Sequence, residues 1–132
     1  MKVSAQVNNS LHQHSVTVST NNAGKTISIH PKETGYGSSV NGGELLMLAL
    51  ATCFCNDLYR EAAKKNITVS NVQVECSGEF GAEGEPGYNF IYKANITADA
   101  LQDEIDELIR HTGSVAEIHN TLRKGLTVSL VQ

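Results

Sequence analysis

Residues 42–53 read GGELLMLALATC and open the longest run of helix-forming residues in the chain. From residue 44 to residue 65 the chain contains neither Gly nor Pro, and Leu, Met and Ala dominate the first half of the run. Such a run has the propensity and the length of one helix of about 20 residues. Asn41 is placed to cap its first turn, with Glu44 three residues on to complete a capping box. Asn66 can take the left-handed conformation that closes a helix.

Segments with strand character come before and after this helix in the sequence. Before it, residues 3–7, 16–18 and 27–29 alternate with period two and predict a β-meander. After it, residues 68–77 and 88–96 predict two strands, and residues 126–131 a last one. Between these lie an amphipathic helix with Asp99 as N-cap and a short helix where Ser114 and Glu117 are in capping-box register. The order βββ-α-ββ-αα-β indicates a single α+β domain over residues 1–132, with an antiparallel sheet packed on the long helix.

The long helix is apolar on almost every side. At about 100° per residue, Leu50, Cys53 and Asp57 fall on one face, and Leu48 and Leu58 on the other. A sheet can cover only one face of such a helix. The simplest cover for the second face is another copy of the chain, so the sequence predicts a homodimer.

Composition narrows the classes of function. The formal net charge is −4 and no run of Lys or Arg supplies a basic face, which argues against nucleic acid as a partner. The longest apolar run, residues 45–51, is far short of a membrane span, and the first ten residues lack the apolar core of a signal peptide. Three cysteines, an odd number, fit free thiols in a reducing compartment, so we expect the cytoplasm.

The three cysteines differ in their surroundings. Cys53 shares a helical face with Asp57 and Arg60, and a cation beside a thiol can lower the thiol pKa, although Asp57 is the closer partner for that arginine. The alternative is a buried thiol that fills core space. Cys55 points away from Cys53, so a disulfide between them requires unwinding the helix. Cys76 lies on the packed face of its strand and is a core residue or a partner for Cys53. No metal site or cofactor site stands out.

With these residues in place, the chain resembles the OsmC/Ohr family of small thiol-dependent proteins. The resemblance rests on residues 42–53, on the transition at 65–69, on the strand at 72–76 and on the segment Asn-Thr-Leu-Arg-Lys-Gly-Leu-Thr-Val at 120–128. It implies an intertwined homodimer in which the two long helices pack together. It also implies reduction of organic hydroperoxides by a reactive cysteine, which matches Cys53, and reduction of the resulting disulfide by a dithiol.

Other positions of the family pattern are changed here. The resolving cysteine corresponds to Ala116, and the catalytic glutamate corresponds to Gly43, next to Glu44. The family's arginine comes from the N-terminal region, whereas no Arg precedes Arg60 in this chain. His119 lies near the lost resolving position and is a candidate for a replacement charge.

Three functions stay open from the sequence. The first is a thiol peroxidase of oxidative-stress type that uses Cys53, with Glu44, Arg60 and His119 as further candidates, an external thiol reductant and no cofactor. The second is a dimer that keeps the interface pocket for a small apolar ligand without catalysis. The third is a structural or regulatory dimer.

Overall fold

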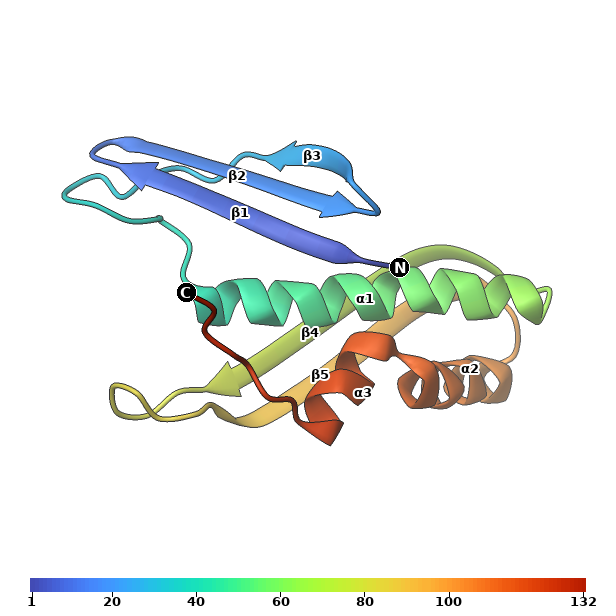
Figure 1. Ribbon diagram of the computed structural model, residues 1–132. Helices are drawn as coiled ribbons and strands as arrows, with labels where there is room; N and C mark the ends of the chain where they lie inside the picture. Colours follow the sequence, from blue (N-terminus) through green and yellow to red (C-terminus); the bar gives the residue numbers. More distant parts are fainter. The chain divides into compact units, whose positions relative to one another are not determined.

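The structure is a computed structural model that describes residues 1–132. Its elements are β1 (Val3–Ser10), β2 (Gln13–Thr20), β3 (Ala23–Ile27), α1 (Gly42–Lys64), β4 (Thr68–Glu79), β5 (Tyr88–Asp99), α2 (Gln102–Val115) and α3 (Glu117–Lys124) (Figure 1). The predicted α+β class is confirmed, with antiparallel sheets and three helices. The chain forms two compact units, Met1–Leu45 and Leu46–Gln132, and each is described by itself. The assignment of residues 1–132 to one domain stays a prediction.

The first unit is the expected β-meander. β1 pairs antiparallel with β2, and β2 with β3. Asn21 and Asn22 both have positive φ, 48° and 67°, which is the backbone of a two-residue hairpin turn whose twist matches the strands. This turn pairs Thr20 with Ala23, so the third strand ends at Ile27. Its predicted position at 27–29 was therefore wrong by several residues, because the turn is tighter than the sequence pattern indicated.

The caps of helix α1 are as predicted. The backbone N–H of Glu44 donates to Asn41 Oδ1 at 2.8 Å, and the backbone N–H of Asn41 donates to Glu44 Oε1 at 3.1 Å. Asn66, just past the helix, has a φ of 56°. The capping box therefore satisfies free backbone N–H groups at the start of the helix, and the left-handed conformation of Asn66 ends it.

The second unit contains an antiparallel pair of strands with two different faces. β4 and β5 place Val72 opposite Ile96 and Cys76 opposite Tyr92. These residues are half-buried and alternate with exposed residues, most of them polar. On the exposed face Lys93 pairs with Glu75 at 2.8 Å. The prediction that Cys76 lies on the packed face is confirmed.

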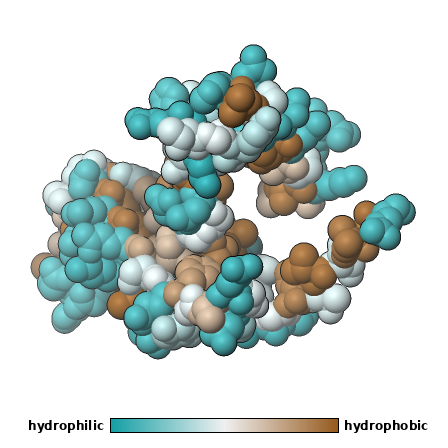
Figure 2. All heavy atoms as spheres, turned by 90° about the vertical axis from the view of Figure 1, so that its left-hand side faces the viewer, coloured by the Kyte–Doolittle hydropathy of each residue, from teal (hydrophilic) through white to brown (hydrophobic).

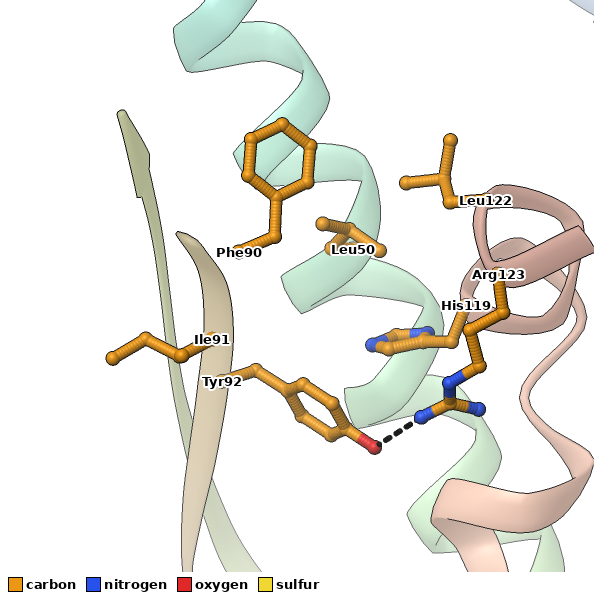
Figure 3. Close-up of a pocket in the computed structure, with 7 residues that line it drawn as sticks. All are labelled: Leu50, Phe90, Ile91, Tyr92, His119, Leu122 and Arg123. Carbon is orange, nitrogen blue, oxygen red and sulfur yellow. Dashed lines mark hydrogen bonds between the residues drawn. The ribbon is translucent and has the colours of Figure 1, made fainter. Parts of the chain in front are cut away.

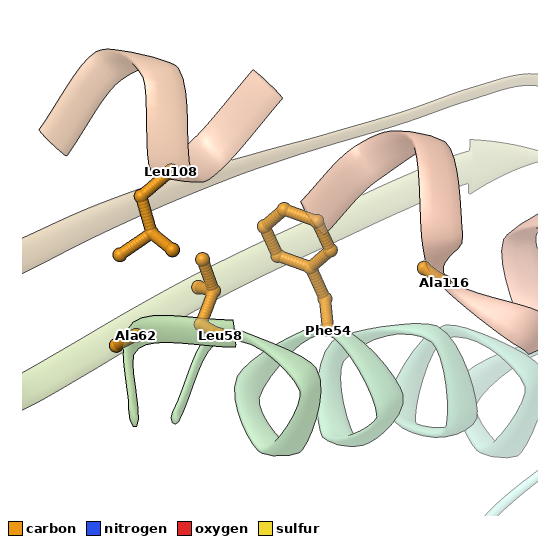
Figure 4. Close-up of a cluster of buried hydrophobic side chains, with 5 residues drawn as sticks. All are labelled: Phe54, Leu58, Ala62, Leu108 and Ala116. Atoms are coloured by element: carbon orange, nitrogen blue, oxygen red, sulfur yellow. The ribbon is translucent and has the colours of Figure 1, made fainter. Parts of the chain in front are cut away.

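A small apolar core joins helix α1 to helix α2 and to the start of α3. It consists of Phe54, Leu58 and Ala62 of α1, Leu108 of α2, and Ala116, all between 0% and 2% exposed (Figure 4). The half-buried side chains of the sheet pack against it. Burying each of the large side chains contributes about 1.5–3 kcal/mol. This core fixes the register between Cys53 on α1 and the first turn of α3.

Two predicted helix starts need correction. Asp99 is the last residue of β5, and α2 is capped at Leu101, whose backbone N–H donates to Glu104 Oε2 at 2.9 Å. Ser114 lies inside α2, where its hydroxyl donates to the carbonyl of His111 at 2.6 Å. Helix α3 begins after Ala116, which offers no side-chain cap. In each case the chain extends the preceding element further than the capping residue indicated.

The strand predicted at residues 126–131 is absent. The chain after α3 pairs with no strand, and Val128 and Leu130 are 93% and 86% exposed. Alternation of apolar residues predicts a strand only if another strand supplies the hydrogen bonds, and none in this chain does so.

Apolar residues also remain at the surface, and Figure 2 shows them as brown patches among polar ones. On helix α1, Leu48 is 60% exposed and Tyr59 is 42% exposed. No helix is both long and apolar enough to cross a bilayer.

Candidate functional site

The candidate site is built around Cys53, in the middle of helix α1. Its thiol is half-buried and donates a hydrogen bond to Asp57 Oδ2 at 3.4 Å, one turn along the helix. The guanidinium of Arg60 bridges two carboxylates, at 3.0 Å from Asp57 Oδ1 and 3.2 Å from Glu117 Oε1. We call Cys53, Asp57, Arg60 and Glu117 the Cys53 cluster.

The pKa of the Cys53 thiol is set by opposing effects. Burial raises the pKa and is the largest influence, because the thiolate loses hydration. The backbone N–H of Ile118, in the first turn of α3, interacts with the sulfur and lowers the pKa. The negative charges of Asp57 and Glu117 raise it again, so the net shift is upward from 9.0. Cys53 is therefore mainly a neutral thiol at neutral pH.

The two carboxylates of the Cys53 cluster differ in character. Burial raises the pKa of Asp57, whose residue is only 6% exposed. The backbone N–H at the start of α3 lowers the pKa of Glu117, which is exposed. A proton brought to this pair therefore prefers Asp57, which also lies next to the thiol.

Arg60 does not activate the thiol directly. Besides Asp57 and Glu117, its Nε donates to Glu61 Oε2 at 3.0 Å, so three carboxylates share its charge. The prediction that Asp57 is its closer partner is confirmed. A sulfur and two carboxylates lie within 4.8 Å of one another, a donor set that could hold a cation. Arg60 already supplies positive charge to both carboxylates of that set.

The other two cysteines, Cys55 and Cys76, do not belong to the Cys53 cluster. Cys55 and Cys76 are half-buried and free, like Cys53. Burial raises the pKa of Cys76. Ala116, at the position where the family resemblance puts a resolving cysteine, is fully buried in the apolar core. The site therefore has one thiol beside the start of α3 and a methyl group where a second would stand.

Glu44 and His119 both lie outside the Cys53 cluster. Glu44 uses its carboxylate in the capping box with Asn41. His119 is 4% exposed and packs on Tyr92 and Phe54, with ring centroids 4.5 Å and 5.5 Å away. Burial and nearby Arg123 lower the pKa of His119. Both effects disfavour the replacement positive charge that the sequence suggested for His119.

Two members of this environment were missed by sequence reasoning. Glu117 and Ile118 lie more than sixty positions after Cys53, and only the packing of α3 on α1 brings them to the thiol. Glu117 was recognised as a residue at a helix start, and that position is the reason for its low pKa. No spacing in the sequence connects it to Arg60.

The family model described as OsmC-like protein matches residues 35–131. The chain therefore belongs to the OsmC-like family, as the resemblance indicated. No functionally curated protein matches the sequence.

Solved structures with the same fold come from several bacteria. An OsmC-like protein from Mycoplasma pneumoniae is 22% identical, covers 91% of this chain and 87% of its own, and has a TM-score of 0.63. An organic hydroperoxide resistance protein from Legionella pneumophila is 21% identical, with 93% and 90% covered and a TM-score of 0.61. An OsmC-like protein of unknown function from Vibrio cholerae is 15% identical, with 91% and 92% covered and a TM-score of 0.66. At these identities the likeness establishes the fold.

Proposed function

We propose that this protein is a single-cysteine thiol peroxidase that reduces organic hydroperoxides at Cys53 and is reset by an external thiol. The observation that carries the proposal is the hydrogen bond from the Cys53 thiol to Asp57, with Asp57 held by Arg60 at 3.0 Å. Two further points support it. The chain belongs to the OsmC-like family, and its structural relative from Legionella pneumophila is described as an organic hydroperoxide resistance protein.

The proposed first step needs no proton from outside the site. The Cys53 sulfur attacks the terminal oxygen of the hydroperoxide and the O–O bond breaks. Asp57 takes the thiol proton and passes it to the leaving alkoxide, which departs as the alcohol. Cys53 becomes a sulfenic acid and gives up the two electrons that reduce the peroxide. The raised pKa of Asp57 suits a group that must hold this proton briefly.

Recovery of the thiol requires an external reductant. One reductant thiol attacks the sulfenic acid and releases water, which leaves a mixed disulfide on Cys53. A second thiol reduces that bond and leaves as the oxidised reductant. Ala116 supplies no internal thiol for the first of these steps. A dithiol reductant carries out both.

The test is to compare alkylation with peroxide reduction in the Asp57→Asn variant. Removing the negative charge of Asp57 lowers the Cys53 pKa, so iodoacetamide should alkylate Cys53 faster than in the wild type at neutral pH. Iodide leaves without a proton, whereas an alkoxide needs one. Single-turnover reduction of cumene hydroperoxide should therefore fall, by about 100-fold if proton transfer is fully lost.

Cys53→Ser is the control and should abolish both reactions, with sulfenate on Cys53 detected by mass spectrometry only in proteins that keep the cysteine. If Asp57→Asn speeds both reactions alike, Asp57 is no more than a repelling charge and the proton relay is wrong. If Cys53→Ser still consumes hydroperoxide, Cys53 is not the reactive group and the proposed function fails.

The second candidate function is ligand binding without catalysis. The specific observation in its favour is the upward shift of the Cys53 pKa together with the methyl group of Ala116 at the second thiol position. On this hypothesis the protein consumes no hydroperoxide in excess dithiol. Turnover that depends on Cys53 would exclude it.

A further inference from the structure

The second unit contains a cavity that the proposed function does not use. It lies between helix α1, strand β5 and helix α3, and its volume is about 100 Å³. We call it the His119 cavity. Figure 3 shows Leu50, Phe90 and Leu122 as its apolar walls, with Tyr92, His119 and Arg123 at its polar end. For scale, a dry apolar cavity of about 150 Å³ holds benzene. The His119 cavity suits a short branched hydrocarbon group.

His119 is an unsatisfied polar group at this cavity. Neither ring nitrogen has a hydrogen-bond partner, although the residue is only 4% exposed. A neutral imidazole has one donor and one acceptor, and burying both without partners is costly. The aromatic rings of Tyr92 and Phe54 pack on it but satisfy neither nitrogen. A ligand with a hydrogen-bonding group would remove part of that cost.

Arg123 brings an unbalanced positive charge to the same place. It donates to Tyr92 Oη at 3.0 Å, to the carbonyl of Gly113 at 2.8 Å and to Asn120 Oδ1 at 2.9 Å. All three acceptors are neutral. The other arginines, Arg60 and Arg110, each pair with a carboxylate. Arg123 is thus a fixed guanidinium without a counter-charge, which is a good partner for a carboxylate.

Tyr92 completes the polar end. Its hydroxyl oxygen accepts the hydrogen bond from Arg123, so its own hydrogen is available to donate. The tyrosine, histidine and arginine side chains therefore place hydrogen-bond donors at one end of a cavity whose other walls are apolar.

We propose that the His119 cavity binds a small branched-chain monocarboxylate, with its hydrocarbon part between Leu50, Phe90 and Leu122. Its carboxylate accepts hydrogen bonds from Arg123, Tyr92 and His119. The apolar walls select against an anion such as acetate, and the guanidinium selects against a neutral molecule of the same shape.

The test uses isovalerate as the probe, with binding followed by isothermal titration and by amide chemical shifts at constant ionic strength. Isovalerate should bind more tightly than acetate or isovaleramide, with shifts centred on residues 119–123. Arg123→Gln should weaken binding by about tenfold or more, since a charge-assisted pair is lost. Arg110→Gln removes the same charge from an exposed pair with Glu107 and should leave binding unchanged.

Leu122→Trp fills the cavity and should abolish binding while Arg123 stays in place. Cys53→Ser should leave binding unchanged, which separates this proposal from the proposed function. Equal weakening by Arg110→Gln and Arg123→Gln would mean non-specific attraction and would overturn the proposal. So would equal affinity for isovaleramide, or unchanged binding in Leu122→Trp.

Discussion

At the scale of single residues, Glu61 is a buried carboxylate held by three neighbouring side chains. Its side chain is 4% exposed, and Lys64, Arg60 and His111 approach it at 2.8, 3.0 and 2.8 Å. Hydrogen bonds from Lys64, then Arg60, then His111 lower the pKa of Glu61 to about 2. Arg60 and Lys64 remain near solvent and supply the positive charge, so the carboxylate is neutralised without burying a net charge.

Glu61→Gln should change how stability depends on pH. A folded-state pKa of about 2, below the ordinary 4.5, means that the ionised carboxylate stabilises the folded protein above about pH 4.5. That stabilisation is lost as the pH falls through 4.5 toward 2. Urea unfolding across this window should show a smaller loss of stability for Glu61→Gln than for the wild type. Glu75→Gln, which removes an exposed pair with Lys93, is the control and should show the same pH dependence as the wild type. If Glu61→Gln also shows the wild-type pH dependence, the Glu61 carboxylate does not have this role.

The Cys53 environment shows which residue contacts a sequence can predict. Asp57 and Arg60 are three positions apart on one helix, so their pairing follows from helical spacing. The contacts of Glu117 and Ile118 with this site depend on a helix that begins after Ala116, far along the chain. The burial of His119 depends on packing against Tyr92 and Phe54. Tertiary contacts of this kind leave no periodic signal, so the sign of the Cys53 pKa shift needed the structure.

At the scale of elements, helix α1 was predictable and the short helices were less so. The long run without Gly or Pro, and its caps at Asn41 and Asn66, agree between sequence and structure. The starts of α2 and α3 were misplaced, because Leu101 and Ala116 are not usual capping residues. A helix whose start is set by packing of its neighbours carries a weaker local signal than one set by its own side chains.

The capping box of α1 gives an element-scale prediction. Asn41→Ala should destabilise the protein by about 1 kcal/mol, because the backbone N–H of Glu44 loses its acceptor. Glu44→Gln should keep most of the stability, since glutamine also serves in a capping box. Thermal unfolding measures both. If Glu44→Gln keeps stability and peroxide reduction alike, Glu44 is a cap; a selective loss of peroxide reduction would instead give it a part in the chemistry.

At the scale of the whole molecule, the homodimer stays a prediction. Leu48 and Tyr59 are exposed on α1, an element that is apolar on nearly every side. Large apolar side chains on one helical face usually mark an interface. Light scattering at micromolar concentration should therefore give about twice the chain mass of 14.2 kDa.

Leu48→Asp should shift the monomer–dimer equilibrium toward the monomer. Leu101→Asp removes an exposed leucine at the start of α2, where aspartate is a favourable cap, and should leave the mass unchanged. A fully folded monomer of the wild-type protein would contradict the predicted dimer. Equal effects of the two substitutions would contradict the assignment of the interface to α1.

The missing side-chain cap at Ala116 has a thermodynamic consequence. Helix α3 starts without a side-chain oxygen, and the backbone N–H of Ile118 in its first turn lowers the Cys53 pKa. Ionisation of the thiol and formation of the helix are therefore linked equilibria, and linkage is reciprocal. The thiolate, more than the neutral thiol, favours a formed first turn of α3, so loss of that turn would raise the Cys53 pKa further. Ionisation of the Cys53 thiol and the order of an eight-residue helix far along the chain are therefore coupled.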